Sequence, residues 1–217
     1  MASDSRALIL DAAERLFAAE GFARTTIKRI GREAGVNSAL LYYYFGDKDR
    51  LYREVLQRLV QTLVERTTGR LAAGGTPAAR LRGLLEAQAG VLTDHPTLPK
   101  LLLRDLADHD AEHAVEQVQL LAATTFRRLC DLIREGQKDG SFRTDLDPRF
   151  AAVSVIAQIG YFHLARPAVR VLLAAPPDGP SPGQTRDFTR HAVQFALAAL
   201  AAPPGPPARR SRPRRTR

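Results

Sequence analysis

The chain has 217 residues, of which 45% are hydrophobic and 25% are charged, a composition typical of a globular protein with a sizeable core. It contains no run of about 18 uninterrupted apolar residues, so no membrane-spanning helix is expected. The N-terminus lacks the pattern of a secretory signal peptide, and the lone cysteine, Cys130, cannot form an internal disulfide; both observations predict a cytoplasmic protein.

The formal net charge of +9 is concentrated at the C-terminal end. Residues 209–217 contain six arginines and no acidic residue, so only a third of the net charge belongs to the rest of the chain. Residues 201–217 are rich in Pro, Ala and Arg and lack the material for a core, which predicts a disordered tail. This tail either adds non-specific, salt-sensitive affinity for DNA or is an unselected flexible end.

Residues 21–48 have the pattern of two short helices around a tight turn. Thr25 and Thr26 are capping residues directly before a helix expected over residues 27–34. In that helix Ile27, Ile30 and Ala34 recur at spacings of three and four and form one buried stripe. Basic residues, among them Lys28, fall mostly off this stripe.

A second helix is expected over residues 38–45. Gly35 ends the first helix, because glycine tolerates the left-handed conformation, and Asn37 caps the second. A rotation of about 100° per residue places Leu41 and Phe45 on the inward face of this helix. Gly46 then breaks the helix, and Asp47 is expected to cap another that starts at Lys48.

The outward face of the second helix is unusual for a surface in contact with water. Ala39 and Tyr43 point away from the core, with Leu40 and Tyr42 beside them. A small alanine allows close approach to base edges, a leucine can contact a thymine methyl group, and tyrosine hydroxyls can reach phosphates. Lys48, at a helix start, can share a phosphate with exposed backbone N–H groups. The pattern therefore indicates a helix that enters the major groove of DNA.

The first 50 or so residues resemble the DNA-binding domain of the TetR family of bacterial transcriptional regulators. The matching residues are Ala12, Leu16, Phe17, Gly21, Phe22, Thr25, Thr26, Ile30, Ala34, Gly35, Val36, Leu41, Tyr42, Tyr44, Phe45, Lys48, Leu51 and Tyr52. The resemblance implies that the DNA backbone is held by Thr25 or Thr26, Tyr42 and Lys48. It places nearest to the bases Lys28, Ser38, Ala39, Leu40 and Tyr43. Gly31, Leu40 and Tyr43 depart from the usual family residues, which leaves the operator sequence open.

The remainder of the chain predicts helices throughout. They are expected over residues 48–66, 78–93, 101–106, 111–137, 148–165 and 185–200, with a short helix at 169–174. The predicted fold is all-α with about nine helices. It comprises a helix-turn-helix DNA-binding domain (residues 1–46), a helical effector-binding and dimerisation domain (residues 47–200) and the tail (residues 201–217).

The last two long helices mix alanines with larger apolar residues, which permits close helix packing. Such helices either pair with their copies in a second subunit or close the core of their own subunit. The resemblance favours a homodimer, and a two-fold dimer implies a palindromic operator in double-stranded DNA. The candidate interface residues are Ala151, Ala152, Val155, Ile159, Ala192, Phe195, Ala196 and Ala199.

The middle helices of such regulators surround a pocket for a small-molecule effector. Apolar side chains with a few hydrogen-bonding groups are candidates for its lining, namely Phe126, Gln158, Tyr161, Phe162 and His163. The alternative is that these residues belong to an ordinary core with polar groups at its edge.

The chain shows little sign of metal or catalytic chemistry. His109 and His113 are four residues apart and could face one metal ion, but no further ligands are evident, and a hydrated polar connection between helices is the alternative. Cys130 is expected to be a small buried residue, with a redox sensor as the alternative. No catalytic motif is present, so neither an enzyme nor a cofactor is predicted.

These observations predict a DNA-binding regulator, in its usual form a dimeric repressor that a small molecule releases from its operator. The alternatives are a ligand-binding or scaffold protein with a vestigial DNA-binding unit, an activator, and a regulator without an effector.

Overall fold

The computed structural model describes residues 2–109 and 112–203, apart from the side chains of residues 2–4, 106, 108 and 109. Within these residues the fold is all-α, as predicted. The helices are α1 (Ala2–Glu20), α2 (Ile27–Ala34), α3 (Ser38–Phe45), α4 (Lys48–Ala72), α5 (Pro77–Asp94), α6 (Thr97–His109), α7 (Val115–Leu121), α8 (Arg127–Lys138), α9 (Pro148–Leu164), α10 (Arg166–Leu172) and α11 (Pro182–Leu200).

The helices at the N-terminal end begin and end where local sequence signals place them. The side chains of Thr26, Asn37 and Asp47 accept hydrogen bonds from backbone N–H groups in the first turns of α2, α3 and α4. Gly35, with φ of 69°, ends α2 in the left-handed conformation that favours glycine. The predicted bounds of α2 and α3 are therefore confirmed.

Several helices differ from their predicted bounds: α10 and α11 each start three residues earlier than expected, and three further predicted helices differ more. α4 continues to Ala72 rather than ending near Arg66, because Thr67 and Leu71 are buried in its last turns. α6 starts at Thr97, because Pro99 lies in the first turn, where its missing N–H costs no hydrogen bond. The expected helix over residues 111–137 begins only at Val115 and is divided into α7, a π-helical segment and α8.

The π-helical segment spans Ala122–Phe126. Within it Thr125 Oγ1 lies 3.0 Å from Thr67 Oγ1 on α4, so the wider turn brings a polar group to the α4 interface. A π turn depends on packing of this kind rather than on a local sequence signal, which is why the sequence pattern predicted a continuous helix.

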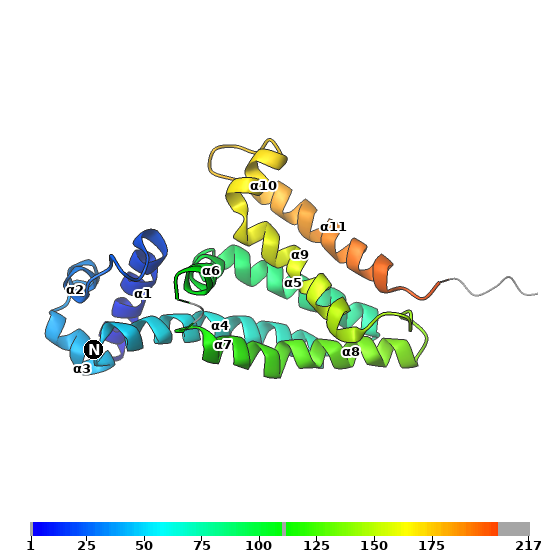
Figure 1. Cartoon of the computed structure of the whole chain (residues 1–217), viewed down its shortest axis with the longest axis horizontal. Helices are drawn as coiled ribbons and strands as arrows, with labels where there is room; N and C mark the ends of the chain where they lie inside the picture. Colours follow the sequence, from blue (N-terminus) through cyan, green and yellow to red (C-terminus); the bar gives the residue numbers. More distant parts are fainter. Residues whose placement is uncertain (1, 110–111, 204–217) are drawn as a thin grey trace, which may run out of the picture.

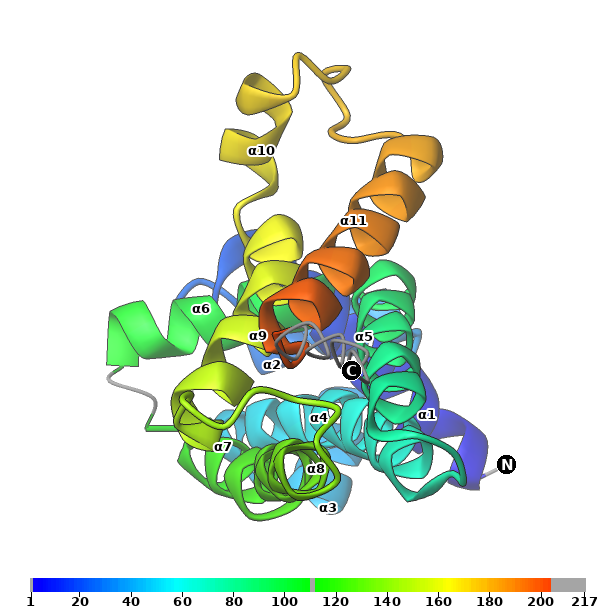
Figure 2. The same cartoon turned by 90° about the vertical axis from the view of Figure 1, so that its right-hand side faces the viewer.

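The helices form two groups that α4 connects (Figure 1). α1, α2 and α3 form a head with buried side chains such as Phe17, Ile30 and Phe45; α2 packs on α1 and α3, which in turn pack against α4. The rest of α4 packs along α5, and α5, α8, α9 and α11 enclose the main core of the body. α10 and the start of α11 rise above the other helices of the body (Figure 2).

The end of α11 is fastened to the turn between α8 and α9. Phe142 and Ala201 form an isolated antiparallel bridge, and the Ala202 N–H donates to the Ser141 carbonyl at 3.1 Å. The start of the predicted tail therefore contacts the body, and residues 204–217 lie outside the described residues.

Candidate DNA-binding surface and ligand pocket

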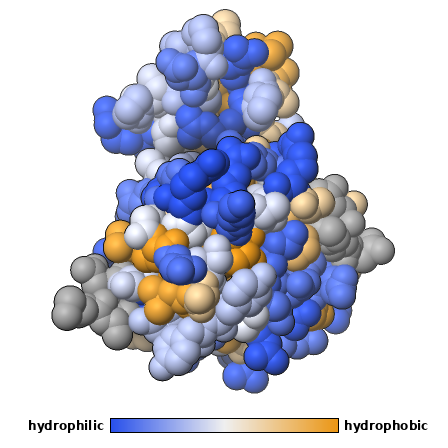
Figure 3. Space-filling view, turned by 90° about the vertical axis from the view of Figure 1, so that its left-hand side faces the viewer, coloured by the Kyte–Doolittle hydropathy of each residue, from blue (hydrophilic) through white to orange (hydrophobic). Residues whose placement is uncertain are grey.

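The outward face of α3 is uncovered. Tyr43 is 80% exposed and Tyr42 is 56% exposed, and Ala39 is exposed between them and the turn. Leu41 and Phe45 on the opposite face are buried, as their spacing predicted. The end of the molecule that carries α2 and α3 presents a largely hydrophilic surface with a few hydrophobic patches (Figure 3). α3 is thus held by one face and offers the other to a partner.

The remaining residues predicted nearest the bases surround this face. Lys28 is exposed on α2, and Ser38 and Leu40 are half-buried on α3. Thr26 is exposed at the start of α2, although its hydroxyl oxygen already accepts a hydrogen bond from the Arg29 N–H at 3.3 Å.

Thr25 requires a correction. Its side chain is fully buried, and its hydroxyl donates to the Gly21 carbonyl at 2.8 Å. The residue therefore fastens the α1–α2 connection and has no free hydroxyl for a phosphate. Of the two adjacent threonines, only Thr26 is accessible, a distinction that depends on the path of the chain after α1.

Lys48 is half-buried at the start of α4, and its ammonium group is partly engaged within the head. Nζ donates to the Phe22 carbonyl at 3.0 Å and lies 4.1 Å from the centre of the Phe22 ring. An ammonium has three N–H donors, so a phosphate contact is compatible with this position. Lys48 also ties α4 to the end of α1.

A cluster of polar and aromatic side chains, in which Tyr52, Asp105 and His113 are buried and Asp49 is exposed, joins the head to the body. We call Phe22, Asp49, Tyr52, Asp105 and His113 the junction cluster. Asp105 of α6 is fully buried, and Oδ2 accepts the backbone N–H groups of His113 (3.2 Å) and of the following residue (2.8 Å). His113 Nδ1 lies 2.8 Å from Asp105 Oδ1, and Nε2 lies 3.3 Å from Asp49 Oδ1 in the first turn of α4. The His113 ring also packs against the rings of Phe22 and Tyr52, with centroid distances of 4.7 Å and 5.2 Å.

The arrangement explains His113 without a metal. The side chain of His109, its predicted partner, lies outside the described residues. Among the described side chains, no group of three or more His, Cys, Asp and Glu residues is placed to hold a metal ion. Cys130 is buried, and burial raises the pKa of its thiol, which disfavours the reactive thiolate.

An apolar pocket of about 210 Å³ lies between α4, α5, α6 and α9. Its lining is almost entirely aliphatic, with one polar side chain, Gln88 of α5. The lining residues are Leu63, Gln88, Leu92, Leu98, Pro99, Leu102, Leu103, Gly160 and Leu164.

None of the residues predicted to line an effector pocket lines this one, and the expectation is corrected on that point. Phe126 is half-buried in the π-helical segment, and Tyr161 is exposed. Phe162 is buried and stacks on Phe188 of α11, with ring centroids 4.1 Å apart. Gln158 faces the groove between α9 and α11. Gln158, Tyr161 and Phe162 of α9 thus point toward α11 or toward solvent, and not toward this pocket.

His163 is buried at the end of α9. Burial, with a smaller contribution from the positive charge of Arg166, lowers the pKa of His163 from an ordinary value of 6.5 to about 4. The folded protein therefore holds this imidazole in its neutral form at neutral pH.

The predicted dimer residues divide into two groups. Ala152, Ile159, Ala192 and Ala196 are buried, as are Ala151 and Val155. These residues contribute to the core of the subunit, although Ala151, Val155 and Ala196 also line a groove between α9 and α11. Phe195 and Ala199 are exposed on α11.

Exposed apolar side chains lie on α9 and α11 beside these buried residues. Phe150 is 72% exposed and Phe195 is 56% exposed, and both line a groove of about 650 Å³ between the two helices. Val153 and Tyr161 of α9 are also exposed. We call Phe150, Val153, Tyr161 and Phe195 the α9/α11 face.

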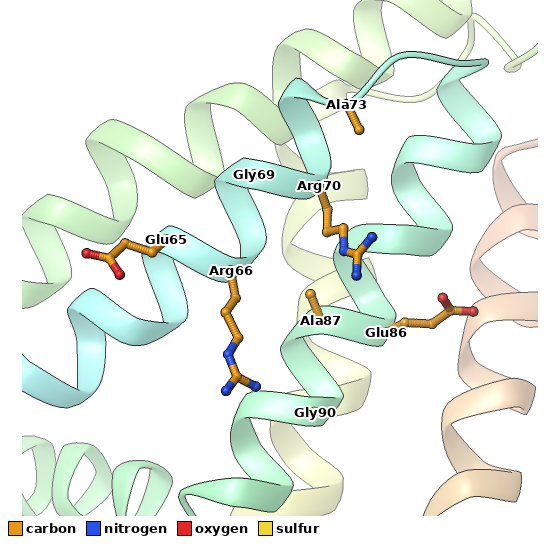
Figure 4. Close-up of a pocket in the computed structure, with 8 residues that line it drawn as sticks. All are labelled: Glu65, Arg66, Gly69, Arg70, Ala73, Glu86, Ala87 and Gly90. Carbon is orange, nitrogen blue, oxygen red and sulfur yellow. The ribbon is translucent and has the colours of Figure 1, made fainter.

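A third hollow, a groove of about 660 Å³, lies between α4 and α5. Small residues such as Gly69 and Gly90 leave it unfilled, and Arg66 and Arg70 extend from α4 toward α5 (Figure 4). Glu65 and Glu86 also line the groove, so its charges balance. Arg66 pairs with Asp94 at 2.9 Å. Nothing in this groove favours a particular ligand.

None of the helices in the described part of the chain combines the length and apolar character needed to cross a bilayer.

Comparison with known proteins agrees with this architecture. Residues 9–55 match the family model of the bacterial regulatory proteins of the tetR family, and residues 74–163 match that of the tetracyclin repressor-like C-terminal domain. The HTH-type transcriptional repressor KstR2 of Rhodococcus jostii is 31% identical over 152 residues, which cover 69% of this chain and 73% of that protein.

Solved structures share the fold. PfmR, a TetR family transcriptional regulator from Thermus thermophilus, has a TM-score of 0.72 and 22% sequence identity, with 88% of this chain and 98% of that chain covered. AibR, solved in complex with isovaleryl coenzyme A and operator DNA, has a TM-score of 0.69 and 18% identity, with 88% and 97% covered. The chain belongs to the TetR family and is a DNA-binding transcriptional regulator.

The lowered pKa of His163 predicts that the stability of the folded protein depends on pH. The unfolded chain binds this proton near pH 6.5 and the folded chain only near pH 4, so stability falls as the pH falls through this window. The slope for one proton is at most about 1.4 kcal/mol per pH unit. We expect His163→Leu to remove this contribution, measured by urea unfolding at fixed protein concentration between pH 7 and pH 4.5. His191→Leu, at an exposed histidine of α11, is the control. An unchanged pH dependence in His163→Leu would contradict the assignment.

Proposed function

We propose that the protein is a dimeric repressor that binds a palindromic operator and leaves it when a small molecule occupies the apolar pocket. The uncovered face of α3 is the observation that carries the proposal. Two exposed tyrosines and an alanine, on a helix whose opposite face is buried, suit a major groove. The repressor names of relatives such as KstR2 support the sign of regulation, and the operator complex of AibR supports the DNA partner.

The proposed DNA contacts follow from exposure. Tyr42, Thr26 and Lys48 hold phosphates, which position the protein without reading sequence. Lys28, Ser38, Ala39, Leu40 and Tyr43 lie nearest the bases. The roles divide between the predicted domains, with residues 1–46 for DNA and residues 47–200 for the effector and the second subunit.

We place the dimer contact on the α9/α11 face. Large apolar side chains such as Phe150 and Phe195 are costly to leave in water, and a two-fold axis would bring each face against its copy. The groove between these helices offers a place for a phenylalanine of the partner. Dimerisation then sets the separation of the two α3 helices.

The proposed route of release runs through α6. The same helix contributes Leu98 and Leu102 to the pocket wall and Asp105 to the junction cluster. A ligand that binds better when α6 is displaced would shift the His113 ring and, with it, Phe22 and the start of α4. The head would then turn, and the α3 helices of a dimer would no longer match two successive major grooves.

The first test is selection of genomic DNA fragments by the full-length protein at about physiological salt. Recovery of a shared palindrome is expected, and its absence would favour the scaffold alternative.

Tyr43→Ala should then reduce the ratio of operator affinity to unrelated-DNA affinity by about tenfold, because a base contact is lost. Tyr42→Phe should weaken both affinities by a similar factor, because a phosphate contact carries no sequence information. Lys28→Ala should weaken DNA binding. Its matched control is Lys138→Ala, at the far end of α8, which should leave DNA binding unchanged.

The dimer proposal predicts that Phe195→Glu in combination with Phe150→Glu yields monomers. The double variant adds two charges to each subunit, and a symmetric contact would bury both sets, which opposes association, so sedimentation should show one subunit. Operator affinity should fall with it, because each head then binds a half-site alone. Val118→Glu places the same charge on an exposed apolar position of α7 and should leave the dimer intact. A double variant that remains dimeric would place the interface elsewhere.

The route through α6 predicts energetic coupling between the pocket and the junction cluster. Gly160→Leu fills the pocket from α9, where an added Cβ meets nothing within 4 Å. His113→Phe keeps an aromatic ring at this position but removes the hydrogen bonds of the imidazole nitrogens. In a double-mutant cycle, operator-binding free energies should deviate from additivity by about 0.5 kcal/mol or more. Gly69→Leu, at an open position of α4, should be additive with His113→Phe. Additivity of both pairs would exclude this route.

A further inference from the structure

The chain leaves the folded body at a fixed point. Ala201 forms an isolated antiparallel bridge with Phe142, and the Ala202 N–H donates to the Ser141 carbonyl at 3.1 Å. We call these two contacts the C-terminal anchor. Residues 204–217, which contain six arginines, follow the anchor after one further residue. The anchor therefore determines where in the molecule this basic segment begins.

The C-terminal anchor lies beside the end of α4 that is remote from the head. Ser141 and Phe142 follow α8, whose Glu135 pairs with Arg80 of α5 at 2.7 Å. Arg80 Nε in turn donates to the Leu71 carbonyl, in the last turn of α4, at 2.9 Å. α4 has 25 residues, so it is about 37 Å long at a rise of about 1.5 Å per residue. The head and the end of α11 accordingly lie at opposite ends of the described molecule (Figure 1).

This separation limits which arginines reach the DNA held by the head. Arg209 lies seven residues after Ala202, and an extended chain covers at most about 3.6 Å per residue. Its Cα atom therefore stays within about 25 Å of the anchor in any conformation. Lys48, a proposed phosphate contact, lies at the other end of α4, about 37 Å away along that helix. Arg209 and Arg210 thus cannot meet the phosphates beside Lys48, and only a segment stretched along the whole of α4 would bring the last arginines there.

The composition of residues 204–217 restricts the partner. The segment has six arginines and no acidic, aromatic or large aliphatic residue. A membrane-binding segment needs apolar side chains that enter the lipid beside its basic ones, and single-stranded nucleic acids are bound by aromatic stacking. Guanidinium groups alone suit phosphates, and a DNA duplex carries one negative charge about every 1.7 Å of its axis. The segment therefore fits the backbone of a nucleic-acid duplex.

We infer that residues 209–217 bind the phosphate backbone of a second DNA duplex while the head holds the first, so that the protein bridges two segments of DNA. The contact depends on charge and reads no sequence. The inference goes beyond the proposed function and rests on only one part of it, the DNA contacts at the end of the molecule that carries α3.

The proposed dimer presents two such segments together. Leu200, the residue before the anchor, lines the same groove as Phe195 of the α9/α11 face. A two-fold contact on that face places both C-terminal anchors on the side of the dimer away from the heads. Two segments that start close together bind one duplex more tightly than either alone, because the second contact is intramolecular.

A capture experiment on the full-length protein tests the bridge. Beads carry a duplex that the head binds, free protein is washed away, and a labelled duplex of unrelated sequence is added. One variant removes the charge of the segment and keeps its length. Its substitutions are Arg209→Gln, Arg210→Gln, Arg212→Gln, Arg214→Gln, Arg215→Gln and Arg217→Gln. A matched control replaces the same six arginines by lysine.

The wild-type protein should capture the second duplex at about 50 mM salt and lose it steeply toward about 200 mM, as a contact made by several charges does. The glutamine variant should capture at least about tenfold less, whereas the lysine variant should stay within about threefold of the wild type, because its charge is unchanged. Thermal unfolding should be the same for all three proteins. Absence of capture by the wild type, equal capture by the glutamine variant, or loss of capture in the lysine variant would each overturn the inference.

The affinity for the first duplex alone distinguishes a bridge from a tail that embraces one DNA. It is measured in solution at low concentration of protein and DNA. The glutamine variant should bind this duplex within about twofold of the wild type, since the arginines near the anchor do not reach it. A loss equal to the loss of capture would show that the segment binds the DNA of the head, and would overturn the inference. Retention of anionic lipid vesicles in preference to the second duplex would do the same.

This inference and the proposed function fail separately. Recognition of a palindrome and its release by a small molecule, without capture of a second duplex, would contradict the bridge alone. Capture that depends on the six arginines, by a protein that selects no shared palindrome, would support the bridge and contradict the proposed repressor.

Discussion

The structure depends on one buried carboxylate. Asp105 accepts two backbone N–H groups from the turn after α6 and faces the ring of His113. That ring lies against Phe22 and Tyr52 and reaches Asp49 at the start of α4. The head is also tied to the body by α4 and by contacts of α1 with α6, where Thr97 donates to Glu14 and Arg104 donates to the Phe17 carbonyl. The cluster is thus one of the connections that orient α3 relative to the body. A buried carboxyl group with well-placed hydrogen-bond partners gives a connection that is directional, unlike apolar packing, which tolerates sliding.

The same helix that carries Asp105 forms one wall of the apolar pocket. The two functional regions therefore share a rigid element instead of communicating through a loop. Most of the pocket wall consists of leucines, whose contacts are non-directional. Polar contacts join α6 to the head on either side of these leucines: Thr97 donates to Glu14 of α1 at 2.5 Å, and Asp105 belongs to the junction cluster. A displacement of α6 must therefore move the head or break these contacts, which is the physical basis of the regulation we propose.

The structure of the DNA-binding domain was largely predictable from sequence, whereas the structure of the body was predictable only in outline. Thr26, Asn37, Asp47 and Gly35 act on the residues next to them, so the bounds of α2 and α3 followed from spacing alone. The exposure of Tyr42 and Tyr43 followed from the same periodicity. In α9 the periodicity identified a helix but gave no information on which neighbour each face meets. Ala152 and Ile159 were therefore assigned to a dimer contact although they are buried within the subunit.

The sequence by itself determined the all-α class and the helix-turn-helix, because caps, glycine stops and apolar spacing are local and act through the backbone. The family followed from the resemblance of the first 50 or so residues to the DNA-binding domain of TetR regulators. Only the tertiary structure decided the roles that depend on distant neighbours. It buried Thr25 against the end of α1, joined His113 to Asp105 and Asp49, and set Gln88 into a pocket of leucines from three other helices. Such environments arise where helices far apart in the chain come into contact, and residue spacing within one helix does not show which other helices it contacts.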